Sequence, residues 1–266
     1  MDVIEMFAHD DDAPPAIPAA TLVIFRNAPA GGAPQVLMVQ RAKEMRFAGG
    51  AAVFPGGRVD EADRVLAADL GAADDEAIDE LSARIAAVRE TLEETGLAVA
   101  FHQSPTLADA RRAREVLLAQ GALAPMLAEM GWTLDLERLV PFSRWRPKHK
   151  EIRVFDTRFY LANLGTGAVD LAVDDTENTH LFWASAADAL AMANSGEIKV
   201  IFPTRRNLER LAQFASFDDA LGHVEAFPSR MITPFMEMRE GQPWLVIPSD
   251  AGYPVDGELL EQASRG

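Results

Sequence analysis

The sequence contains no cysteine. The chain therefore has no disulfide framework, no thiol nucleophile and no zinc site built on thiolates. It is also short of cations, because 25 lysines and arginines face 41 aspartates and glutamates and leave a net charge of −16. Binding to nucleic acid depends on neutralising phosphates, so this balance argues against a nucleic-acid partner. A small anionic ligand is compatible with the charge, provided that metal cations and local arginines hold it.

No stretch is long and apolar enough to suggest a membrane span, and residues 1–5 lack the basic start of a secretion signal. We therefore expect a soluble cytoplasmic protein that binds no membrane. Hydrophobic residues make up 48% of the 266 positions, enough for a substantial core. We expect an acidic N-terminal arm over residues 1–18, a single domain over 19–250 and a polar C-terminal tail over 251–266.

The most informative stretch is an acidic helix end. A helix is predicted from Asp75, because apolar residues recur at spacings of three and four, and Gly96 suits the left-handed position that ends it. Glu90, Glu93 and Glu94 fall on one face away from that stripe, where they repel one another and oppose the helix dipole. Hard divalent cations would relieve the repulsion, and the alternative is a solvated acidic helix end. The apolar stripe consists of Ile78, Leu81, Ile85, Val88 and Leu92.

A glycine pair lies upstream of this helix. Residues 51–53 predict a short strand, and the following residues 54–57 predict a tight turn that contains Gly56 and Gly57. Because glycine lets the backbone approach a metal or a phosphate closely, Gly57 is a candidate to place its carbonyl oxygen beside the carboxylates.

Together the two stretches resemble the Nudix box, in which a glycine and a glutamate precede the pattern Arg-Glu-hydrophobic-x-Glu-Glu-x-Gly-hydrophobic. Asp63 stands where the family has the first glutamate, and Thr91 replaces a hydrophobic residue. Between Asp63 and Arg89 lie 25 residues where the pattern has seven. We interpret the insert, 64–88, as a loop and an elongated helix, and such an interrupted box resembles the branch of the peroxisomal coenzyme A diphosphatase of mammals. The matching residues are Gly57, Arg89, Glu90, Glu93, Glu94, Gly96 and Leu97.

The segment before the glycine pair also resembles the coenzyme A diphosphatases. Their motif is matched at the correct spacing, although Val39 and Ala42 replace its threonine and serine hydroxyls. Arg41, Lys43 and Arg46 form a positive patch that suits a phosphate group, and the alternative is ordinary surface charge. The matching residues are Leu37, Arg41, Arg46, Gly50, Phe54, Pro55, Gly56 and Gly57.

Two later stretches add candidate ligands. Residues 144–153 are the most basic part of the chain, and they either guide a polyphosphate or balance the acidic insert. Arg153 belongs to a segment that again resembles the interrupted-box branch, and Trp145 is either a core residue or faces a base. Glu177 lies in an acid-rich loop, which is either a plain turn or the source of the extra carboxylate that Nudix enzymes commonly bring to the metal.

The resemblance implies a Nudix-like α/β/α sandwich with a mixed β-sheet, an extended Nudix helix and an additional helical insertion, and it suggests a homodimer. The insertion spans residues 106–131 and should break into two helices near Gly121 and Pro125. Further helices are predicted over 185–194 and 205–214. Strands are predicted over 21–26, 35–40, 98–101, 154–162, 181–183 and 244–247.

The resemblance also implies a pyrophosphohydrolase dependent on Mg²⁺ or Mn²⁺, in which water attacks phosphorus and a phosphoanhydride is cleaved. Glu90, Glu93 and Glu94 would hold the metal together with the Gly57 carbonyl. Glu90 or Glu177 would accept the proton of the water, and Arg89 would orient the carboxylates. Substrate contacts are expected from Arg41, Arg46, Phe54 and Arg153.

The expected substrate is coenzyme A or an acyl-coenzyme A, which would give 3′,5′-ADP and phosphopantetheine derivatives. ADP-ribose, NADH and dinucleoside polyphosphates are rival substrates within the same chemistry. A nucleotide sensor without turnover is a rival of another class, and three crowded carboxylates argue against it. An RNA-processing hydrolase is disfavoured by the charge.

Overall fold

The structure is a computed structural model that describes residues 15–41, 50–147, 154–165 and 178–263. Arg46, Arg153 and Glu177, which the sequence suggests as site residues, lie outside these ranges. Among the helices within the ranges, none combines the length and the apolar character that crossing a membrane requires.

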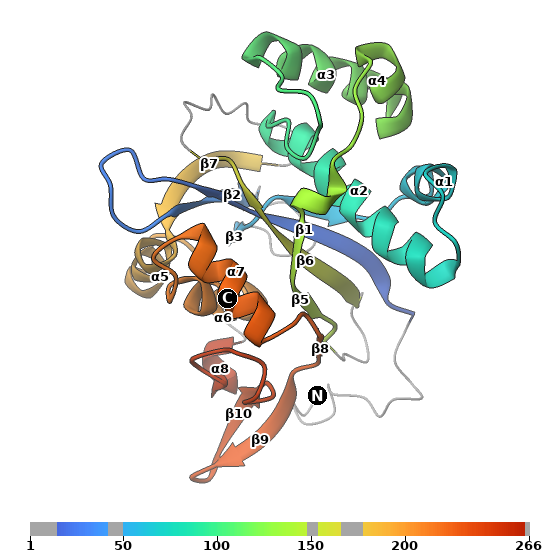
Figure 1. Cartoon of the computed structure of the whole chain (residues 1–266). Coiled ribbons are helices and arrows are strands. Elements are labelled where there is room, and N and C mark those ends of the chain that lie inside the picture. Colours follow the sequence, from blue (N-terminus) through green and yellow to red (C-terminus); the bar gives the residue numbers. More distant parts are fainter. Residues whose placement is uncertain (1–14, 42–49, 148–153, 166–177, 264–266) are drawn as a thin grey trace.

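A mixed β-sheet forms the centre of the fold (Figure 1). Within the described residues, eight strands join it in the order β3-β2-β1-β6-β5-β8, with β4 paired to β1 and β7 paired to β2. β1 runs antiparallel to β2, which confirms the predicted hairpin, and parallel to β6. The strands are β1 (Ile17–Arg26), β2 (Gln35–Arg41), β3 (Ala52–Val53), β4 (Gly56–Arg58), β5 (Val140–Trp145), β6 (Phe155–Asn163), β7 (Asn178–Ser185) and β8 (Met231–Ile232).

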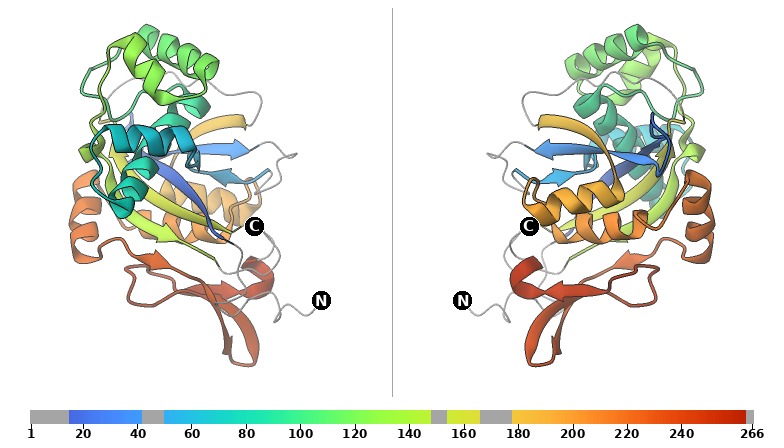
Figure 2. Two further views of the ribbon diagram at one scale, coloured as in Figure 1. Left: turned by 90° about the vertical axis from the view of Figure 1, so that its right-hand side faces the viewer. Right: turned by 90° about the vertical axis from the view of Figure 1, so that its left-hand side faces the viewer.

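The central strand of the sheet is buried on both faces. Successive residues of a strand point to opposite faces, and β1 carries the apolar run Leu22-Val23-Ile24-Phe25. Leu22 and Ile24 join one core cluster with α2 (Asp75–Thr95), whereas Val23 and Phe25 join a second cluster with α5, α6 and α7. Helices therefore cover both faces (Figure 2), which confirms the predicted α/β/α sandwich. The helices of the second layer are α5 (Ala186–Ser195), α6 (Phe202–Leu211) and α7 (Phe217–Ala226).

Helix α2 begins and ends where its sequence predicts. The Asp74 side chain accepts a hydrogen bond from the backbone N–H of Ala77. At the other end, Gly96 adopts a φ of 72° and donates its N–H to the carbonyl of Leu92. The apolar stripe faces the core, with Ile85 and Leu92 fully buried. The prediction of an elongated helix that ends at a glycine is confirmed.

The structure corrects the loop expected at the start of the insert. Residues Glu61–Asp69 form helix α1, which packs beside α2 and buries Leu66 and Ala67 in the shared core. Its first turn is a capping box, in which the side chains of Asp60 and Asp63 each accept a hydrogen bond from the other residue's backbone. The insert is therefore a pair of packed helices joined by a short turn.

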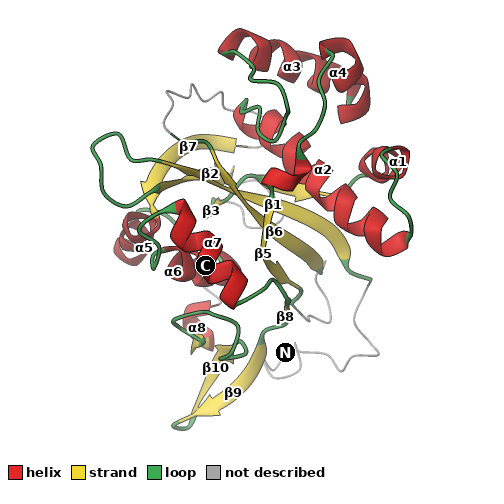
Figure 3. Ribbon diagram, in the orientation of Figure 1, coloured by secondary structure: helices red, strands yellow, loops and turns green. Residues whose placement is uncertain are grey.

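A two-helix segment lies at the C-terminal end of α2 (Figure 3). It consists of α3 (Leu107–Gln120) and α4 (Leu123–Met130), which are separated at Gly121 as the sequence predicts. Gly121 has a φ of 68° and ends α3 by donating its N–H to the carbonyl of Leu117.

The strand predicted over 98–101 is wrong. Within that stretch Phe101 makes only an isolated bridge, to Leu134. Ala100 has a φ of 61°, and a residue in the left-handed region cannot continue a strand.

Both expected terminal segments contain regular structure. Residues 17–18, which are expected in the N-terminal arm, belong to β1. The expected polar tail instead forms a strand and a short helix, and Leu260 is only 8% exposed. The strand is β11 (Gly257–Leu259), which joins β10 (Gln242–Val246) and β9 (Phe235–Arg239) in a small second sheet of order β11-β10-β9. The helix is α8 (Leu260–Ala263).

Candidate active site

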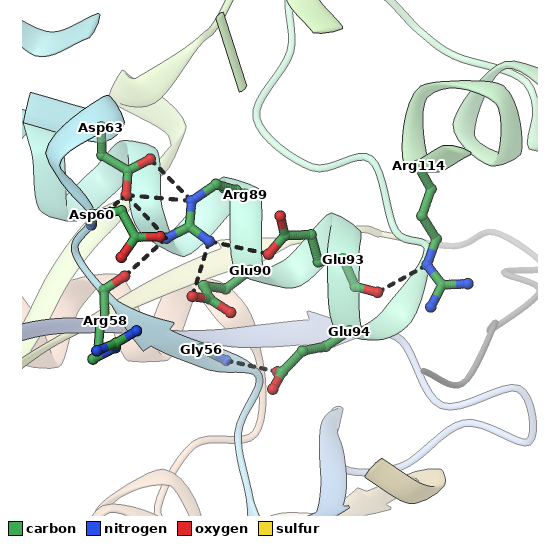
Figure 4. A network of polar contacts seen from close by, with 9 residues as sticks. All are labelled: Gly56, Arg58, Asp60, Asp63, Arg89, Glu90, Glu93, Glu94 and Arg114. Atoms are coloured by element: carbon green, nitrogen blue, oxygen red, sulfur yellow. Dashed lines mark hydrogen bonds and ion pairs between the residues drawn. The ribbon is translucent and has the colours of Figure 1, made fainter. Parts of the chain in front are cut away.

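Glu90, Glu93 and Glu94, here called the acidic cluster, lie on the last turns of α2 next to β4 (Figure 4). Glu94 is 5% exposed, and its carboxylate accepts a hydrogen bond from the backbone N–H of Gly56 at 3.0 Å. The side chains of Glu90 and Glu93 are more open, at 17% and 19% exposure. The structure thus brings the glycine pair and the acidic helix end together.

Gly57 is in direct contact with the cluster. A β-carbon built on Gly57 would lie 2.3 Å from both Cδ and Oε1 of Glu90, so a side chain at position 57 would displace this carboxylate. Gly56 is restricted for another reason, because its φ is 154° and its β-carbon would lie 2.3 Å from the carbonyl oxygen of Ala20. Pairing with β1 makes residues Gly56–Arg58 a strand, which corrects the prediction of a simple tight turn.

Arg89 links the acidic cluster to helix α1. Its Nη1 group donates to Glu90 and to Glu93, each at 3.0 Å. Its Nε and Nη2 groups both donate to Asp63 at 3.0 Å, and Nη2 also donates to the carbonyl of Arg58 at 2.9 Å. Burial alone would lower the pKa of Arg89, but the Asp63 hydrogen bond and the neighbouring carboxylates outweigh it and raise the pKa. Every guanidinium hydrogen is therefore committed to a neighbouring group.

Asp63 keeps its place beside Arg89 in spite of the insertion. It is 1% exposed and lies in the first turn of α1, ahead of the inserted residues. The extra length is contained in the rest of α1, the following turn and the first part of α2. The insertion therefore extends the two helices outward and leaves the Asp63–Arg89 pair intact.

Glu90 and Glu93 favour their protonated forms when no cation is bound. Burial is the main cause that raises the pKa of Glu90 to about 8; Arg89 opposes this shift, and the charges of Glu94 and Glu93 add to it. Burial likewise raises the pKa of Glu93. A divalent cation would replace these protons and remove the repulsion between the carboxylates.

The donor chemistry of the cluster fits a hard divalent cation. Its side chains offer carboxylate oxygens, the ligands that Mg²⁺ and Mn²⁺ prefer. In the part of the chain that the structure describes, no three His, Cys, Asp or Glu side chains are yet arranged around one point to hold a metal. Glu93 is bonded to Arg89, and Glu94 is bonded to the Gly56 amide. The candidate ligands therefore lie on one helix end, and some of them would have to exchange partners for a cation to bind.

Two aromatic residues that the sequence suggests near the substrate have a packing role. Phe54 is only 2% exposed and packs in the core cluster of α5, α6 and α7, on the opposite face of the sheet from α2. Trp145 is 1% exposed, and its Nε1 donates to the hydroxyl of Tyr253 at 3.2 Å, so it does not face a base. Arg41 ends β2, opposite Asn178 of β7, and is partly exposed.

Sequence reasoning missed two polar residues beside the cluster. Asp60 lies 3.6 Å from Nη2 of Arg89, and its capping-box spacing to Asp63 is a signal that could have found it. Arg114 of α3 donates from Nε to the carbonyl oxygen of Glu93 at 2.8 Å. No local signal marks this second contact, because it depends on how α3 packs against α2.

Comparison with known proteins places the chain in a family. The NUDIX domain family matches residues 16–204. The crystal structure of a NUDIX hydrolase from Alicyclobacillus acidocaldarius is 30% identical, with a TM-score of 0.67 and coverage of 78% of this chain and 96% of that one. The acyl-coenzyme A diphosphatase NUDT19 of Gallus gallus is 25% identical in an alignment that covers 76% of this chain and 69% of the relative. Because the family match spans more than half of the sequence, the protein belongs to the Nudix hydrolases.

Proposed function

We propose that this Nudix hydrolase is a divalent-metal-dependent pyrophosphohydrolase that cleaves coenzyme A or acyl-coenzyme A into 3′,5′-ADP and phosphopantetheine derivatives. The observation that carries the proposal is the contact of the acidic cluster with Gly56 and Gly57 of β4. Support for the substrate comes from the chicken relative, whose name is acyl-coenzyme A diphosphatase, and from the motif between Leu37 and Gly57.

The metal site would be formed by the acidic cluster with the carbonyl oxygen of Gly57. These donors are all oxygens, which favours Mg²⁺ or Mn²⁺ over softer ions. When bound, the cation would supply charge neutralisation on the diphosphate and a lower pKa for water. The close contact between Gly57 and Glu90 supports a role for the backbone at position 57, because a side chain there would displace the carboxylate.

The chain's own residues would prepare the water for attack. Arg89 holds Glu90 and Glu93 in fixed orientations before the substrate arrives. Glu90 is the candidate to accept the proton of the attacking water, because its carboxylate lies against Gly57 at the proposed metal site. Glu177, outside the described residues, is the alternative base.

Arginines outside the box would bind the phosphates of the substrate. Arg89 has no hydrogen left for this purpose, since its own bonds use all of them. The candidates are Arg41, which lies within the described residues, and Arg46 and Arg153, which lie outside them. Guanidinium groups suit this role because they present paired donors to phosphate oxygens.

The proposal can be tested by product analysis. Coenzyme A, ADP-ribose, NADH and diadenosine tetraphosphate would each be incubated with the protein in Mg²⁺, in Mn²⁺ and in chelator. We expect metal-dependent release of 3′,5′-ADP from coenzyme A. If ADP-ribose or NADH is cleaved and coenzyme A is not, the proposed pyrophosphohydrolase activity stands and the assignment of coenzyme A as the substrate is wrong. Tight binding of a nucleotide without any turnover would reject the enzyme and favour a sensor.

A further inference from the structure

Helix α3 reaches the acidic cluster through one side chain. Ala113, Val116 and Leu117 are buried on the side of α3 that packs in the core with α2. Arg114 follows Ala113 and extends to the end of α2, where its Nε bonds the Glu93 carbonyl at 2.8 Å. The last carbonyls of a helix lack partners within it, and the helix dipole favours cations there. The last turn of α2 contains no basic residue, so α3 supplies the cation.

This bond uses only one of the five guanidinium hydrogens of Arg114. Within the described residues, its Nη groups form no hydrogen bond or ion pair, and neither of them is buried. Figure 4 shows Arg114 on the other side of Glu93 from Arg89. The two arginines therefore flank Glu93, one buried and fully bonded, the other with accessible donors.

The other arginines around the cluster cannot take this role. All hydrogens of Arg89 are bonded to Asp63, Arg58 and the cluster. Arg58 alternates with Gly57 along β4, so its side chain points to the face of the strand away from Glu90. Of the three arginines in Figure 4, Arg114 alone combines unused donors with a position at the acidic end of α2.

We propose that Arg114 binds a phosphate group of the nucleotide substrate. Its Nε is held by Glu93, and its two Nη groups form a fork for two phosphate oxygens. This inference rests on the proposed function and makes the α3–α4 segment part of the substrate site. In a protein of net charge −16, a cation fixed at the C-terminal end of α2 also favours the approach of an anionic substrate to this end of the helix.

The test compares Arg114→Ala and Arg114→Lys with Arg112→Ala as the matched control. Arg112 lies on the same helix, is exposed, and pairs with Glu115 and Glu129 on the surface. For each protein we would measure kcat and KM for coenzyme A and ADP-ribose with Mg²⁺. The Kd for ADP would be measured by calorimetry without divalent metal, and the Kd for Mn²⁺ without nucleotide.

We expect Arg114→Ala to raise both KM and the Kd for ADP by about 10- to 100-fold, the range for lost hydrogen bonds to a charged group. The kcat and the Kd for Mn²⁺ should change by less than about threefold, well below that range. Arg114→Lys should raise KM and the Kd for ADP less than Arg114→Ala does, because lysine keeps the positive charge. A rise should remain, because one ammonium cannot bond the Glu93 carbonyl and a phosphate through separate nitrogens. Arg112→Ala should match the wild type.

A lower kcat and weaker Mn²⁺ binding at unchanged KM and unchanged ADP affinity would show that Arg114 only holds the end of α2, and would overturn the inference. If Arg114→Ala does not fold, the lysine variant decides by the same criterion. If the wild type hydrolyses coenzyme A and the variants have the same KM, the inference is refuted and the proposed function stands. A wild type that neither binds nor cleaves a nucleotide refutes the proposed function together with the inference.

Discussion

Replacing Gly57 by alanine should separate activity from stability. The new β-carbon would lie 2.3 Å from Cδ and Oε1 of Glu90, whereas ordinary van der Waals contact begins at 3.4 Å, so the carboxylate must move by about 1.1 Å. The obstructing atoms are the far end of a side chain that is 17% exposed, and they can move without displacing the backbone. A misplacement of about 1 Å at a reacting centre lowers a rate by about a hundredfold. We therefore expect kcat/KM of Gly57→Ala to fall about a hundredfold, with Tm within about 4 °C of the wild type.

Two other glycines provide the comparison for this assay of initial rates and thermal unfolding. Gly56→Ala places its β-carbon against the backbone oxygen of Ala20 and keeps a φ of 154°, so it should lower stability by about 2 kcal/mol or more. The β-carbon of Gly222→Ala in α7 meets no atom within 4 Å. This variant should keep the wild-type rate, and its free energy of unfolding should rise by up to about 1 kcal/mol. A Gly57→Ala protein with full activity would refute the assignment of Glu90 to the metal and the water.

Three further outcomes follow from the same site. Glu94→Gln should lower kcat by about a thousandfold. Glu76→Gln, on the exposed first turn of α2, should keep the wild-type kcat, and equal kcat values in the two variants would show that Glu94 is not part of the site. Asp63→Asn breaks a buried pair with Arg89 and should lower the free energy of unfolding by about 2–4 kcal/mol, and an unchanged urea midpoint would contradict this. Glu90 has a pKa of about 8 in the folded protein against 4.5 for the ordinary group, so between these values the folded state keeps a proton that the unfolded chain has released. The Tm of the metal-free protein should therefore fall as the pH rises from about 5 to about 8. This slope should be smaller in Glu90→Gln and in saturating Mg²⁺, and a slope that is the same in all three samples would contradict the role of Glu90.

The acidic helix could be predicted from the sequence because its signals are local. The apolar spacing, the N-terminal Asp74 and the terminal Gly96 all act within one or two helical turns. The break between α3 and α4 was predictable for the same reason, since Gly121 ends α3 in a left-handed conformation. In α1, Leu66 is the only large apolar residue that is buried. One such residue does not form the repeated apolar spacing that predicts a helix, so the sequence indicates a loop there.

The parts that could not be predicted depend on contacts between distant segments. Phe54 matches a substrate-site motif, yet strand register turns its ring into the core on the far side of the sheet. Leu260 belongs to a short terminal segment whose burial depends on the β9–β11 sheet. Arg114 reaches Glu93 across 21 residues of sequence, a contact that only tertiary packing creates. Local pattern therefore predicts the carboxylates of the site better than the groups that surround them.

The side-chain bridge between Asp63 and Arg89 affects how this chain can tolerate insertions and how it can be engineered. Because the two halves of the box meet through side chains, their geometry does not depend on how many residues join α1 to α2. The joining turn, residues 70–74, is largely exposed, with Leu70 at 53%. Insertions and deletions can accumulate there without a change in the chemistry. The same independence makes this turn the natural position for a reporter peptide, or for dividing the chain into two fragments that reassemble.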